Sequence, residues 1–166
     1  YMGTPAGRAV IEVAGIVPIG SRKAYHLIAR AHSSKLFSVF YPVNDRVDSF
    51  VDTETLLPVR FEKHLREGRR YINDEVTLFD HTGKLARNWN LTRTRGRDWG
   101  EIELMRPSWD DNSAHEIEIP DGVQDALTSF YYLRSHELLV GQKFVVPVNA
   151  DEKNYRVEVE VLRREK

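Results

Sequence analysis

The chain has 166 residues, with 24 Lys and Arg, 25 Asp and Glu, and a net charge of −1 at pH 7. This length suits one domain that buries its own core, and the balanced charge gives no general attraction to nucleic acid or to an anionic membrane. The absence of cysteine excludes disulfides, thiol catalysis and cysteine-ligated zinc.

Most of the chain alternates apolar and polar residues with a period of two, which is typical of β-strands with one buried face. The alternation is clearest near the end, where Tyr155, Val157 and Val159 are separated by charged residues. About a dozen strands are therefore expected. In chain order they include residues 8–13, 24–31, 36–41, 47–51, 58–65, 70–79, 85–92, 99–105, 115–119, 144–148 and 155–161.

The sequence pattern of one segment, residues 122–134, predicts a helix. Pro120 precedes it, and Asp121 is a suitable N-cap that forms a capping box with Gln124. A helical period places five apolar residues on one arc. They are Val123, Ala126, Leu127, Phe130 and Leu133. We therefore expect a mainly β (α+β) fold, in which a curled antiparallel sheet wraps one central helix.

Arg134 falls in the middle of the apolar arc of this helix. A guanidinium at that position either extends from the helix end or meets a carboxylate inside the fold. Two roles are open: a structural Arg that holds the helix to the sheet, or a residue at the mouth of a ligand cleft.

Charge is distributed unevenly along the predicted sheet. Basic residues dominate positions 60–97 and acidic residues dominate positions 98–125. Adjacent antiparallel strands can pair such charges across the sheet. The alternative is a basic groove, with Trp89 and Trp99 among the Arg residues, that stacks on nucleotides or binds a polyanion.

No known catalytic or metal-binding motif is present, so we expect no catalytic residues, no metal site and no cofactor. The six histidines are scattered, without a helical i, i+4 pair. The remaining candidates for acid–base chemistry are two loop pairs. They are Asp80–His81 and Asp110–Asp111.

Several segments resemble the bacterial domain-of-unknown-function family 3108. The most specific is the predicted helix, and the resemblance runs over nearly the whole chain. The segments that carry it are Ser49-Phe50-Val51-Asp52, Thr55-Leu56-Leu57-Pro58-Val59-Arg60-Phe61, Phe79-Asp80, Ile119-Pro120, the stretch from Val123 to Arg134, Tyr155 and Arg164-Glu165.

This resemblance implies an exported protein of the bacterial periplasm or envelope, made with a signal peptide. It also implies a spiral β-roll related to the half-barrel lipoprotein carriers. Family members usually continue past the position of Arg164-Glu165. Residues 1–166 are therefore expected to form a single β-roll domain that lacks further C-terminal strands.

Two functional hypotheses follow. The first is a non-catalytic envelope binding or scaffold protein, whose partner is a small hydrophobic or peptide ligand or an envelope protein, and not nucleic acid. Its expected ligand-binding residues lie on or beside the helix. They are Arg134, Phe130, Tyr131, Tyr132 and Asp125. The alternative is a hydrolase of envelope polymers that uses loop carboxylates.

Overall fold

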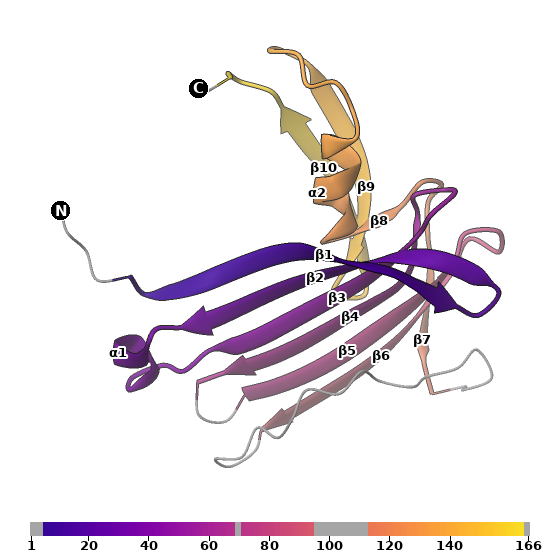
Figure 1. Cartoon of the computed structure of the whole chain (residues 1–166). Helices are drawn as coiled ribbons and strands as arrows, with labels where there is room; N and C mark the ends of the chain where they lie inside the picture. The colour runs from indigo at the N-terminus through magenta and orange to yellow at the C-terminus, as the bar shows by residue number, and fades with distance from the viewer. Residues whose placement is uncertain (1–4, 69–70, 95–112, 165–166) are drawn as a thin grey trace.

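A computed structural model of the chain describes residues 5–68, 71–94 and 113–164 (Figure 1). The described residues form a large antiparallel sheet, a small second sheet and two short helices. The large sheet runs in sequence order through seven strands. They are β1 (Gly7–Ile19), β2 (Arg22–Ser33), β3 (Asn44–Asp52), β4 (Pro58–Glu67), β5 (Tyr71–Asp80), β6 (Leu85–Thr94) and β7 (His115–Glu118).

The remaining elements lie outside this meander. A short helix, α1, follows β2 directly, and the second helix, α2, follows the first strand of the small sheet. In that sheet β8 pairs parallel with β9, which pairs antiparallel with β10. The elements are α1 (Lys35–Ser38), β8 (Gln124–Asp125), α2 (Thr128–Arg134), β9 (Lys143–Ala150) and β10 (Lys153–Glu160).

The mainly β prediction is confirmed, but the prediction of a curled sheet around a central helix is wrong. The large sheet twists without closing or curling strongly, and α2 with the small sheet stands on one side of it (Figure 1). A helix of 7 residues is only about 10 Å long, so it covers a few strands rather than filling a roll.

The predicted helix over residues 122–134 is half its expected length. Gly122 takes a left-handed turn with φ of 69°. The next two residues pair with β9, where Gln124 is opposite Val148 and Asp125 is opposite Asn149. These pairings occupy backbone hydrogen-bonding groups of Gln124 and Asp125 that a helix would need. The helix therefore begins only after Asp125.

The apolar run at residues 36–41 is another difference, because α1 and a turn replace the expected strand. The strand expected at residues 99–105 lies outside the described residues. In the part of the chain that the structure describes, no helix is long and apolar enough to cross a membrane.

The core lies between the large sheet and the elements that follow β7. Alternation along β2–β6 directs one set of side chains to this side. The buried cluster contains Leu27, Val51, Phe61, Phe79, Ala86, Ile119, Val123 and Leu127.

The charge pairing expected between strands is present. Arg87 Nη2 lies 2.7 Å from the Glu116 carboxylate across β6 and β7, and Lys63 Nζ lies 2.6 Å from Glu75 across β4 and β5. Trp89 is buried in β6, and Trp99 lies outside the described residues. These contacts favour cross-strand pairing over the basic groove.

Candidate functional site

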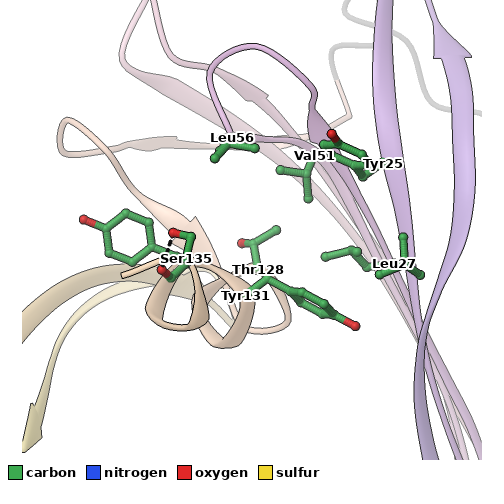
Figure 2. A pocket seen from close by; sticks show the side chains of 9 residues that line it. Tyr25, Leu27, Val51, Leu56, Thr128, Tyr131 and Ser135 are labelled. Atoms are coloured by element: carbon green, nitrogen blue, oxygen red, sulfur yellow. Dashed lines mark hydrogen bonds between the residues drawn. The ribbon is translucent and has the colours of Figure 1, made fainter. Parts of the chain in front are cut away.

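An apolar pocket lies between the start of the large sheet and helix α2. Its volume is about 250 Å³, and it is partly open to solvent. Figure 2 shows Thr128 and Tyr131 of α2 facing Leu27 and Val51 of the sheet. The full lining consists of Val13, Tyr25, Leu27, Val51, Leu56, Thr128, Tyr131, Tyr132 and Ser135.

The sheet wall of this pocket follows from strand register. Val13 in β1 is opposite Leu27 in β2, and Tyr25 in β2 is opposite Val51 in β3. These four residues therefore share the face of the sheet that points toward α2. Leu56, in the turn after β3, closes one end with its backbone at a positive φ of 57°.

Helix α2 is fixed over the sheet by reciprocal buried hydrogen bonds between Asp125 and Thr128, its first residue, and no helix begins at the predicted cap Asp121. The Asp125 Oδ1 atom accepts hydrogen bonds from the amides of Leu127 at 2.8 Å and Thr128 at 2.7 Å. In return, the Thr128 hydroxyl accepts a hydrogen bond from the Asp125 amide at 2.8 Å. This reciprocal arrangement satisfies donors that a helix start otherwise leaves unpaired.

The same carboxylate joins the helix to the sheet. Ser49 Oγ, on β3, donates to Asp125 Oδ2 at 2.5 Å, and both residues are fully buried. Burial raises the pKa of Asp125 to about 6, and the hydrogen bonds from Ser49, Thr128 and Leu127 oppose this rise. A buried ionisable group is thus part of the support that positions the pocket wall.

The pocket lining is apolar with hydroxyl groups and carries no formal charge. The nine described lining residues include three tyrosines, one threonine and one serine, but no Asp, Glu, Lys or Arg. The Ser135 hydroxyl donates to the Tyr132 carbonyl at 2.7 Å, the bond drawn as a dashed line in Figure 2. Such a surface suits an uncharged, largely apolar molecule.

The five residues predicted to bind a ligand separate into three groups. Tyr131 and Tyr132 line the pocket. Asp125 is buried beneath it and supports the helix. Phe130 is 61% exposed, and Arg134 is also exposed. Neither of these two belongs to the lining, so the pocket gives no support to Arg134 as a partner for an acidic ligand.

The sheet half of the pocket was not identified as a site from the sequence. The alternation along β2 places Tyr25 and Leu27 on one face, but it does not show which face meets the helix. Val13 and Leu56 are more than 40 residues from Thr128 in the sequence and meet it only through the fold. Because they are apolar, the sequence alone does not distinguish these pocket residues from ordinary core residues.

A cluster of buried polar residues lies on the face of the large sheet opposite to the pocket. His64 Nδ1 is 2.9 Å from Asp74 and its Nε2 is 3.2 Å from Glu62, while Arg66 Nη2 is 2.7 Å from Asp74. All four residues are buried. Burial lowers the pKa of His64, but the hydrogen bonds to Glu62 and Asp74 outweigh this effect and raise it.

The ion pairs of this polar cluster continue along β4, where Arg60 lies 2.5 Å from Glu62. Similar pairs lie on β3 and β2, where Asp48 accepts bonds from Arg46 at 2.6 Å and from His26 at 2.6 Å. Each carboxylate in this row has a basic partner in the same row. These ion pairs therefore connect neighbouring strands of the sheet.

Of the two loop pairs suggested for hydrolysis, the one that the structure describes, Asp80–His81, does not form an acid–base site. Asp80 Oδ1 accepts the amides of Thr82 and Gly83 and so stabilises the turn, whereas His81 Nε2 lies 2.7 Å from the carbonyl of Pro58 at the start of β4. Asp110 and Asp111 lie outside the described residues. Among the residues that are described, no group of three or more His, Asp or Glu side chains could hold a metal ion.

Comparison with known proteins gives one match. The model of a family described as "Protein of unknown function (DUF3108)" matches residues 1–166. The resemblance found in the sequence is thereby confirmed over the whole chain. No curated protein and no solved structure matches this chain.

Proposed function

Because this chain belongs to the family described as "Protein of unknown function (DUF3108)", whose description specifies no reaction, we propose its function from the pocket beside α2. The protein is a non-catalytic binding protein for a small, uncharged, lipid-like molecule. The ligand lies between Tyr25 and Leu27 of the sheet and Tyr131 of the helix. The observation that carries this proposal is the apolar, charge-free lining of the pocket.

The size of the pocket limits the ligand. A volume of about 250 Å³ exceeds the roughly 150 Å³ of an engineered apolar cavity that binds benzene. It lies just below the range of about 300–1,000 Å³ typical of pockets that hold drug-sized ligands. The pocket therefore encloses a short apolar group or one segment of a longer chain, whose remainder extends through the opening to solvent.

Chemistry supports binding over hydrolysis. Uncharged hydroxyls can orient a ligand, but they need a neighbouring base before they act as nucleophiles. The described lining holds no His, Asp or Glu. A hydrolase of envelope polymers remains an alternative only through the residues around Asp110 and Asp111, which lie outside the described part.

A rim substitution tests this proposal. Val13 and Ile11 lie on the same face of β1 and are 52% and 54% exposed, but only Val13 lines the pocket. Val13→Trp should fill the pocket and reduce binding of a neutral fluorescent lipid probe about tenfold or more. Ile11→Trp, the matched control, should bind as the parent does.

Two results would contradict the proposal. One is equal probe binding by both Trp variants. The other is stronger binding of an anionic fatty acid than of its neutral methyl ester, because a charged group has no partner in the described lining. Thermal unfolding of both variants should confirm that neither substitution unfolds the protein.

The site of action is also proposed from the family resemblance rather than from the pocket. We infer that the native protein is exported and works in the periplasm or envelope. Cell fractionation tests this inference, and recovery of the native protein with a cytoplasmic marker would overturn it.

A further inference from the structure

The turn that follows β2 exposes a continuous group of large apolar side chains. This apolar turn comprises α1 and the residues after it, and it lies at one end of the large sheet, away from α2 (Figure 1). Its side chains are between 43% and 78% exposed, and Phe40 is the most exposed. The group consists of Leu36, Phe37, Val39, Phe40 and Tyr41. Contiguous exposed apolar surface of this kind marks interaction sites.

The apolar turn is held in a defined conformation. The Ser38 amide donates to the Ser34 carbonyl at 2.8 Å, and the Tyr41 amide donates to the Phe37 carbonyl at 2.8 Å. The Tyr41 ring packs over Gly68, where an added Cβ would meet the ring at 3.1 Å. The apolar side chains are thus presented to the outside by an ordered backbone.

The charge of the apolar turn selects one kind of partner. Residues 33–43 contain one basic residue, the exposed Lys35, and no acidic residue. Two acidic residues adjoin the turn in the fold: Asp45, which accepts the amide of Arg66 at 2.9 Å, and Glu67, whose backbone bridges that of Val43. A cation beside exposed aromatic rings matches the phosphate and acyl boundary of a lipid bilayer.

We propose that the apolar turn inserts into the surface of a lipid bilayer, with Phe40 in the acyl boundary and Lys35 at the lipid phosphates. Insertion to the depth of the headgroup boundary, about 5–10 Å, buries the exposed rings without a spanning segment. The pocket beside α2 takes no part in this contact. The two proposals can therefore fail separately.

Vesicle sedimentation with the whole chain tests this insertion. We expect the protein to bind vesicles of phosphatidylcholine with phosphatidylglycerol, and Phe40→Asp to weaken this binding about tenfold or more. Leu162→Asp is the matched control, because Leu162 is 75% exposed but lies outside the turn. Lys35→Gln should reduce the preference for phosphatidylglycerol over phosphatidylcholine alone.

Equal vesicle binding by the parent and Phe40→Asp would overturn the proposal, as would absence of binding by the parent. Self-association of the parent that Phe40→Asp abolishes, without vesicle binding, would instead assign the turn to an interface between copies. Val39→Asp, at a position 60% exposed, repeats the test if Phe40→Asp does not fold. The neutral-probe assay should give the parent value in both variants, because neither residue lines the pocket.

Discussion

Ser49 and Asp125 are 76 residues apart in the chain, yet the Ser49 hydroxyl donates to the Asp125 carboxylate at 2.5 Å. Both side chains are fully buried. The bond joins the third strand of the sheet to the residue whose carboxylate accepts the amide of Thr128, the first residue of α2. Because α2 supplies one wall of the pocket, this contact connects the stability of the fold to the shape of the site.

Removing the hydroxyl should destabilise the protein. Ser49→Ala leaves a buried carboxylate without one of its donors, which costs about 1–3 kcal/mol. Urea unfolding at neutral pH measures the change. The control is Ser129→Ala, since the Ser129 hydroxyl donates to the exposed carbonyl of Ala126 in the turn before α2 and its loss should cost less than about 0.5 kcal/mol. Equal effects would show that the Ser49 bond contributes nothing specific.

The raised pKa of Asp125 predicts a pH dependence of stability. Its folded value is about 6, against an ordinary value of 3.8. Between these values the folded state holds more protons than the unfolded state. The contribution of Asp125 to the free energy of unfolding is therefore greatest below 3.8 and falls as pH rises through about 6, by about 3 kcal/mol in all.

Comparison with Asp125→Asn isolates this effect. Asparagine does not titrate, but it can still accept the amides of Leu127 and Thr128 and donate to Ser49. Urea unfolding from about pH 4 to about pH 7 should show the parent losing stability relative to the variant as pH rises. Parallel curves would refute the raised pKa.

Two apolar residues of the helix region should respond very differently to truncation. Leu127 is 5% exposed in the core cluster, whereas Phe130 is 61% exposed. Leu127→Ala should cost about 2–5 kcal/mol, and Phe130→Ala less than about 1 kcal/mol. Denaturant unfolding of the pair measures the contrast. A larger loss of stability for Phe130→Ala than for Leu127→Ala would mean that α2 packs against the sheet through a different face.

His64 should remain protonated above its ordinary pKa of 6.5, because Glu62 and Asp74 both accept from its ring. Its contribution to stability is complete below 6.5 and is lost as pH rises through the folded value. An NMR titration of the ring reports this pKa. Asp74→Asn should lower it, and Asp121→Asn, at an exposed carboxylate, should leave it unchanged.

The sequence by itself determined the elements whose hydrogen bonds and burial are local or repetitive. Among the described strands, alternation identified all but β8, and it wrongly predicted a strand at residues 36–41. Thr128 to Arg134 were recognised as helical because apolar residues recur there at helical spacing. The family was also evident from segments along the chain. Tyr131 and Tyr132 were predicted as site residues because they lie on that helix.

Only the tertiary structure decided where the helix begins and which residues share the pocket. Gln124 and Asp125 are compatible with a helix, but their pairing with β9 takes their backbone hydrogen bonds into a sheet. Likewise, Val13 and Tyr131 lie 118 positions apart and meet only after the strands have paired. Long-range pairing depends on the register of every strand between two residues, and local periodicity does not contain that information.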